Sequence, residues 1–260
     1  MTGSLMRVNQ LWRLLMTSAS FTLFGLGGLL LSLFWFNLLL LVVRNRDKRR
    51  RIARRSISLS FRAFLAFTRV TGVLNYRIHG AETLRQERGC LVVANHPTLI
   101  DYVLIASVMP ETDCLVKSAL LKNPFVSGVI RAADYLINSE ADTLLPQSKA
   151  RLRRGDTLLI FPEGTRTQPG EQMKLQRGAA NIAVRCQSDI RLVTIRCSEH
   201  MLNKQSQWYQ VPLAKPMFDI TVRERIAIDD FFDANKQEPA LAARTLNRHL
   251  LQKLQLVENL

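Results

Sequence analysis

Two short polar motifs, each directly after an apolar run, hold the side chains of this sequence best suited to chemistry. The first is Asn95-His96-Pro97-Thr98-Leu99-Ile100-Asp101 and the second is Phe161-Pro162-Glu163-Gly164-Thr165-Arg166. Histidine has the side-chain pKa nearest to neutrality, which makes His96 a candidate general base. Asp101 lies near the start of the following helix, where its carboxylate can reach back and hold His96 in one tautomer.

The second motif has the residue types of an anion-binding loop. It follows Thr157–Phe161, an expected buried strand, and ligands of open α/β sheets bind at such strand ends. Gly164 permits close backbone approach, and the guanidinium of Arg166 can hold phosphate or carboxylate through two hydrogen bonds. A plain turn with a surface arginine is the competing interpretation, just as a lone histidine at a strand end is often only a satisfied polar residue.

Other catalytic signatures are missing from the sequence. A serine nucleophile would be marked by Gly-x-Ser-x-Gly, which does not occur, and no cysteine lies in a thiolate motif. If His96 is a base, the expected nucleophile is therefore a hydroxyl of the substrate, attacking an already activated acyl group. The cysteines are expected to be reduced and buried, and the four histidines form no ligand cluster, so no metal is expected.

From residue 76 onward, apolar runs bounded by turn residues alternate with helical patterns. The predicted strands are 76–79, 90–94, 114–117, 135–137, 157–161, 190–195 and 218–222. The predicted helices are 101–109, 123–132, 144–153, 178–186 and 238–257. This alternation predicts an α/β fold with a mixed, largely parallel sheet flanked by helices.

An apolar segment and a basic cluster precede this pattern. Residues 21–43 carry no charge over 23 positions, enough for one N-terminal transmembrane helix, and their flanks do not fit a cleaved signal peptide. Residues 44–55 hold eight basic residues against Asp47 in a chain of net charge +15, which favours anionic lipid over nucleic acid. The basic excess after the segment predicts a single-pass protein of the inner (cytoplasmic) membrane with its catalytic domain facing the cytoplasm.

These features divide the chain into an anchor with a cytoplasmic Arg-rich patch at residues 1–55 and a catalytic domain at residues 56–260. Residues 56–74 read as an amphipathic helix that either lies in the membrane interface or packs on the domain. Within the apolar segment, Gly25, Gly27 and Gly28 are expected to let helices or lipid pack closely.

The two motifs, in this order and 65 positions apart, resemble those of the membrane-associated glycerolipid acyltransferases, which include the lysophosphatidic acid acyltransferases. The resemblance covers about residues 76–225. Lys117, Lys174 and the helix start at Gly178 also fall where that family has similar residues.

The resemblance implies roles for individual residues. His96 and Asp101 would be the catalytic base and its orienting carboxylate. The acceptor-binding residues would be Glu163, Gly164, Thr165, Arg166 and Lys174. The acyl donor would be a thioester of coenzyme A or acyl carrier protein, with no cofactor and no metal, and the acceptor a lysolipid, with 1-acylglycerol-3-phosphate the first candidate in phospholipid biosynthesis.

Two departures from the family pattern affect the acceptor. Residues 133–138 match a further motif of the family, which usually ends in an arginine that contacts the acceptor phosphate; this sequence has Asn138 there. Residues 192–196, around Thr194, match another family motif but lack its usual proline. Losing a hydrogen bond to a charged group removes about 1.5–3 kcal/mol. The same chemistry on a non-phosphate acceptor, such as an amino-acid lipid, a glycolipid or a hydroxylated acyl product, is therefore an open alternative. A non-catalytic membrane scaffold that binds anionic lipid is the remote one.

Overall fold

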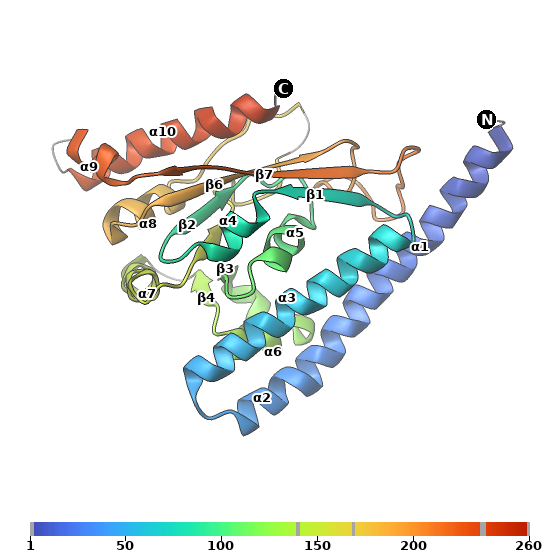
Figure 1. Ribbon diagram of the computed structural model, residues 1–260, viewed down its shortest axis with the longest axis horizontal. Helices are drawn as coiled ribbons and strands as arrows, with labels where there is room; N and C mark the ends of the chain where they lie inside the picture. The colour runs from blue at the N-terminus through green and yellow to red at the C-terminus, as the bar shows by residue number, and fades with distance from the viewer. Residues whose placement is uncertain (1–2, 139–140, 168–169, 235–237, 259–260) are drawn as a thin grey trace.

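Seven strands pair in the order β1-β7-β6-β2-β5-β3-β4 in the computed structural model, which describes residues 3–138, 141–167, 170–234 and 238–258 (Figure 1). Their bounds are β1 Asn75–His79, β2 Leu91–Ala94, β3 Asp113–Lys117, β4 Leu136–Asn138, β5 Leu158–Ile160, β6 Ile190–Cys197 and β7 Met217–Ile226. Only β6 and β7 pair antiparallel among these strands. The predicted mixed, largely parallel sheet is confirmed.

Helices bury both faces of the sheet, which is why the neighbouring strands β2 and β5 are apolar at every position. Successive residues of β2 point to opposite faces: Leu91 and Val93 enter one apolar cluster, and Val92 and Ala94 enter the other. The first cluster is covered by α7 Ala141–Arg153, α8 Gly178–Cys186 and α10 Pro239–Glu258. The second is covered by α3 Arg46–Val70, α4 Ala81–Gln86 and α5 Asp101–Val108.

All seven strands and all five helices predicted from residue 76 onward are present, with ends that differ by at most four positions. The helix predicted at 56–74 is part of α3, which begins ten positions earlier. The helix predicted at 123–132 is α6 Pro124–Ala133, capped by the side chain of Asn123. The short helices α4 and α9 Asp229–Ala234 and the 3₁₀-helix Ser118–Lys122 were not predicted, because segments of one or two turns have too little apolar periodicity to be recognised.

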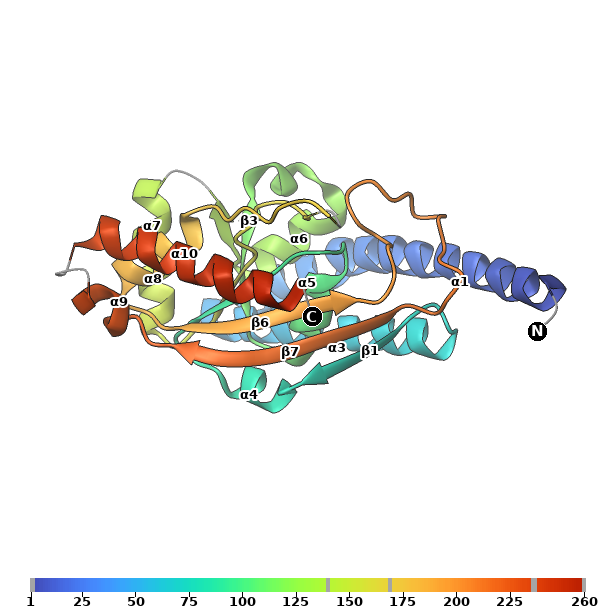
Figure 2. The same cartoon turned by 90° about the horizontal axis from the view of Figure 1, so that it is seen from above.

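A long helical segment precedes the sheet. It runs from α1 Gly3–Leu30 through the π-helix Leu31–Phe36 to α2 Asn37–Val42, and α3 then runs back beside it (Figures 1 and 2). Within the described residues, Arg7–Val42 is the one stretch of helix long and apolar enough, by length and composition, to cross a membrane. The candidate membrane helix therefore begins earlier than the predicted residue 21.

This segment packs against the domain along its length. Phe36 and Leu39 are buried against α3 and α6. Nearer the N-terminus, the ring of Phe24 lies 6.3 Å from that of Phe61 and 5.1 Å from that of Phe64, both on α3. Helix α3 packs on the domain, which is the second of the two placements left open for residues 56–74. The helix also runs without a break through the expected boundary between residues 55 and 56.

The closest approach between the N-terminal segment and the domain is at Gly128 of α6. The hydroxyl of Ser32 accepts a hydrogen bond from the Gly128 amide at 3.1 Å and donates one to the carbonyl of Pro124 at 3.0 Å. A Cβ on Gly128 would lie 2.4 Å from the carbonyl oxygen of Ser32, so only glycine fits. At residues 25, 27 and 28 an added Cβ meets no described atom within 4 Å, so the expected close packing of helices there is wrong; lipid contact stays a prediction.

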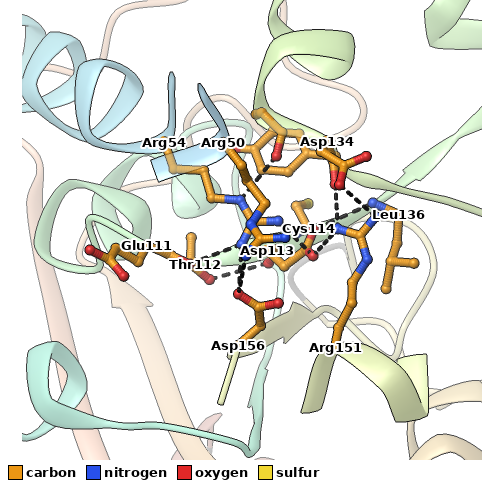
Figure 3. A network of polar contacts seen from close by, with 12 residues as sticks. Arg50, Arg54, Glu111, Thr112, Asp113, Cys114, Asp134, Leu136, Arg151 and Asp156 are labelled. Carbon is orange, nitrogen blue, oxygen red and sulfur yellow. Dashed lines mark hydrogen bonds and ion pairs between the residues drawn. The ribbon is translucent and has the colours of Figure 1, made fainter. Parts of the chain in front are cut away.

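Two arginines of the basic cluster are buried in an ion-pair network that joins α3 to the sheet (Figure 3). Arg54 lies 2.7 Å from the carboxylate of Asp113, which has no exposed surface at the start of β3. Arg151 of α7 contacts the same carboxylate, and Arg50 lies 3.8 Å from Asp156. These two arginines are therefore held by the domain. Arg46 and Arg55 are exposed but pair with Asp134 and Glu111, which leaves the exposed Arg44, Lys48 and Arg51 as the candidates to meet lipid.

Candidate active site

The fold brings His96 and Asp101 together at the carboxyl end of β2. The strand ends at Ala94, the chain turns, and Asp101 begins α5. The Nδ1 atom of His96 lies 2.8 Å from Oδ2 of Asp101. A carboxylate in the first turn of a helix is also favoured by the helix dipole. The geometry is that of the base and orienting carboxylate expected from the sequence.

Thr98 completes the surroundings of Asp101. Its backbone amide donates to Oδ2 at 2.7 Å, and its hydroxyl donates to the other carboxylate oxygen. Complete burial raises the pKa of Asp101, and the hydrogen bonds from His96 and Thr98 counteract this effect. An ionised carboxylate only accepts hydrogen bonds, so it places the ring proton of His96 on Nδ1 and leaves Nε2 as the base.

The imidazole of His96 packs against an aromatic ring and is partly exposed to solvent. Its ring stacks on Phe161, with centroids 4.4 Å apart and planes at 26°. The side chain keeps 22% of its surface exposed, while that of Asp101 keeps none. A substrate hydroxyl can therefore reach the base, and water cannot reach its carboxylate partner.

Glu163 connects the second motif to the first. It is 4% exposed and accepts a hydrogen bond from the backbone amide of His96 at 2.7 Å. The hydroxyl of Thr167 donates to its other oxygen, and the Thr167 amide donates to the carbonyl of His96 at 3.3 Å. Burial raises the pKa of Glu163, and these hydrogen bonds lower it. The structure thus places Glu163 beneath the site, where it positions His96, rather than at the surface where an acceptor would bind.

The remaining residues of the expected anion-binding loop lie at the surface. Gly164 adopts a left-handed φ of +70°, and both it and Thr165 are exposed. The Nη1 atom of Arg166 donates to the carbonyls of Leu202 and Asn203, each at 2.9 Å, which ties the motif to the chain between β6 and β7. Lys174 is exposed.

Asn95 is a positioning residue that the sequence interpretation did not assign. Its amide donates to the carbonyl of Ile195 at 2.8 Å and accepts from the amide of the same residue at 2.7 Å. It thereby continues the pairing of β2 with β6 just past the end of the ladder. Its position directly before His96 could have indicated from the sequence that Asn95 helps to position the histidine. Thr98 and Thr167 were not assigned either, although each bonds a motif carboxylate three or four positions away.

All four cysteines are free; Cys90 and Cys186 are buried as expected, whereas Cys114 and Cys197 are half-buried. Burial raises the pKa of Cys90 and of Cys114 to about 12, and that of Cys197 to about 11. Thiols with such values stay protonated near neutral pH and are poor nucleophiles. A hydroxyl supplied by the substrate remains the group that His96 would activate.

Residues 75–198 match the acyltransferase family. The 1-acyl-sn-glycerol-3-phosphate acyltransferase of Helicobacter pylori is 29% identical over 153 residues, 56% of this chain and 63% of the relative. The enzyme of the same name from Pseudomonas aeruginosa is 26% identical over 45% of this chain and 48% of its own length. The chain thus spans about half to 63% of the length of these curated relatives.

A solved structure has the same fold. The 1-acyl-sn-glycerophosphate (LPA) acyltransferase PlsC from Thermotoga maritima aligns with a TM-score of 0.66 over 94% of this chain and 97% of its own. Its sequence identity is 21%, so the likeness concerns the arrangement of helices and strands.

Proposed function

We propose that this chain, whose residues 75–198 match the acyltransferase family, is an O-acyltransferase that moves a fatty acyl group from a thioester to the hydroxyl of a lysolipid. The observation that carries the proposal is the pair of His96 and Asp101, 2.8 Å apart at the end of β2. Its imidazole is accessible and its carboxylate is fully buried.

In the proposed mechanism, Nε2 of His96 takes the proton of the acceptor hydroxyl as its oxygen attacks the thioester carbonyl. An oxygen–carbon bond forms, the carbon–sulfur bond of the tetrahedral intermediate then breaks, and the proton passes to the departing thiolate. Asp101 stabilises the transient imidazolium and fixes its orientation. General-base assistance of this kind contributes roughly 10²- to 10⁴-fold to the rate.

The donor that we propose is acyl-coenzyme A or acyl carrier protein, and the first candidate acceptor is 1-acylglycerol-3-phosphate, in phospholipid biosynthesis. Relatives whose names specify this acceptor support the choice. The phosphate would be bound by the exposed residues Gly164, Thr165 and Lys174, together with the half-buried guanidinium of Arg166. A non-phosphate acceptor is the second candidate, and the observation that favours it is Asn138, a neutral residue at the exposed end of β4.

An acceptor screen with purified full-length protein tests the proposal. Each donor is offered with lysolipids that do and do not carry phosphate, and acylated product is measured. His96→Ala should lose product formation while keeping its unfolding temperature. His79→Ala, at a histidine whose side chain is 61% exposed on β1, should keep full activity as the matched control. Full activity of His96→Ala would sink the mechanism, and no turnover with any acceptor would favour the scaffold alternative.

We further propose attachment to the inner membrane with the domain on the cytoplasmic side, as the basic residues after the apolar segment indicate. Because the helical segment from α1 to α2 packs on the domain, its outer face is the part left for lipid. Leu26 of α1, Phe34 of the π-helix and Leu41 of α2 are 55%, 68% and 79% exposed. This packing favours a helix lying along the membrane surface over a single-pass helix that crosses it alone.

Thiol labelling separates the two topologies. In sealed vesicles with the domain outside, Val8→Cys should react with a membrane-impermeant maleimide if α1 lies along the surface. It should be protected until the vesicles are opened if α1 crosses. The parent protein gives the background from native thiols, and Leu241→Cys, on α10, reports a fully accessible position.

A further inference from the structure

The chain between β6 and β7, residues 198–216, carries three large apolar side chains that face outward. Trp208 is 47% exposed, Tyr209 54% and Leu213 65%. Tryptophan and tyrosine have an apolar body and a polar group, a combination that concentrates where membranes meet water. An exposed apolar group of this kind marks a binding surface more often than a solvated loop.

This loop continues the apolar face of α1. The ring of Trp208 lies 6.1 Å from that of Phe21 on α1 and 5.6 Å from that of Tyr209. Figure 2 shows the loop, in orange, beside the N-terminal helix. At the same end of the molecule, Trp12 of α1 donates to the carbonyl of Thr71 at 3.0 Å. The loop, α1 and the end of α3 thus form one side of the protein.

The loop is also bonded to the candidate active site. The carbonyl of Leu202 accepts from Arg166 at 2.9 Å and from the amide of Leu99 at 2.9 Å. Leu99 lies between His96 and Asp101 in the chain and is itself 50% exposed. The loop is therefore bonded both to the second motif and to the segment that connects His96 to Asp101.

We propose that residues 198–216 form a second lipid-docking element, in which Trp208, Tyr209 and Leu213 enter the same bilayer surface as α1. The exposed Lys204 and Lys215 on the loop suit anionic headgroups. Docked in this way, the loop would hold Leu99 and Arg166 against the membrane. A lipid acceptor could then reach His96 without passing through water. This inference deepens the proposed attachment to a membrane.

Fluorescence of a single tryptophan tests the docking without relying on catalysis. The full-length variant Trp12→Phe/Trp35→Phe keeps Trp208 as its only indole. It is reconstituted into vesicles of phosphatidylcholine and phosphatidylglycerol, with and without bromine on the acyl chains. We expect the emission to shift to the blue, to be lost in the brominated vesicles, and to become less accessible to acrylamide in the water.

A matched control places the only indole on the far side of the domain. In Trp12→Phe/Trp35→Phe/Trp208→Phe/Leu241→Trp, the reporter lies on α10 at a position that is 44% exposed in the parent. Its emission should be unaffected by bromine and fully accessible to acrylamide. If the Trp208 emission behaves like this control while the protein is vesicle-bound, the docking proposal is wrong. The proposed acyl transfer would be untouched by that result, because the acceptor screen tests it separately.

Discussion

The carboxylate of Glu163 accepts a hydrogen bond from the backbone amide of His96 at 2.7 Å. The two candidate motifs are therefore in direct contact, although 67 positions separate these residues. With its other oxygen bonded to Thr167, Glu163 has a role in the backbone position of the base. In the proposed mechanism it would act through His96, because its buried carboxylate is bonded to the backbone of that residue.

Replacing Glu163 should accordingly lower kcat and leave the KM for the acceptor unchanged. Glu163→Ala leaves the buried amide of His96 without its acceptor, which costs about 1–3 kcal/mol of folding free energy. Glu163→Gln keeps one oxygen to accept that bond and should recover most of the stability. Steady-state kinetics and thermal unfolding measure both effects. A raised acceptor KM at unchanged kcat would instead show direct acceptor binding.

Thr98→Val should move the acid limb of the pH–rate profile to higher pH. The hydroxyl of Thr98 donates to Asp101 and lowers the pKa of that buried carboxyl, so its removal raises the pKa further. The proposed mechanism requires the His96–Asp101 pair in its unprotonated form, and a pair that binds its proton more tightly would lose activity earlier as pH falls. A hydrogen bond to a charged group is worth about 1.5–3 kcal/mol, or roughly one to two pH units.

The measurement is kcat/KM at a series of acidic pH values for three proteins: the parent, Thr98→Val, and Thr98→Ser, which keeps the hydroxyl. The serine variant should follow the parent. An acid limb that stays in place for Thr98→Val would show that the Asp101 carboxylate does not control it.

The sequence predicted the sheet and the His96–Asp101 pair because both follow from local pattern. Runs such as Leu91 to Ala94 are apolar at every position, as strands buried on both faces must be. His96 follows β2 and Asp101 opens the next helix, so a short turn was enough to bring them together. His96 and Asp101 are neighbours in the chain, and each strand is recognisable from its own residues even though its pairing partners lie far away in the sequence.

Features made by distant segments were not predictable in this way. Arg54 belongs to a basic cluster that reads as a solvated, lipid-facing patch, yet its partner Asp113 comes from a strand 59 positions later. The close contact of Ser32 with Gly128 likewise depends on how the π-helix Leu31–Phe36 lies on α6. No local pattern reports such contacts, because they exist only after the N-terminal helices have docked on the domain.

Arg54→Ala should destabilise the whole protein, whereas Arg55→Ala should not. The first leaves the buried carboxylate of Asp113 with only part of its counter-charge, and breaking a buried pair costs about 3–5 kcal/mol. Arg55 pairs with Glu111 at the surface, with 64% of its side chain exposed, and such pairs contribute about 0–1 kcal/mol. Denaturant unfolding in detergent compares the two neighbours directly, and equal losses of stability would contradict the buried network.

Gly128→Ala should loosen the N-terminal segment from the domain. The new methyl group would overlap the carbonyl oxygen of Ser32, and overpacking at such a contact costs about 1–3 kcal/mol. Gly27→Ala is the matched control, because its methyl group meets no described atom within 4 Å and alanine favours a helix more than glycine does. Limited proteolysis between α2 and α3 and thermal unfolding should both show the loss for Gly128→Ala and none for Gly27→Ala. If the two variants behaved alike, the docking of α1 on α6 would not depend on the contact between Ser32 and Gly128.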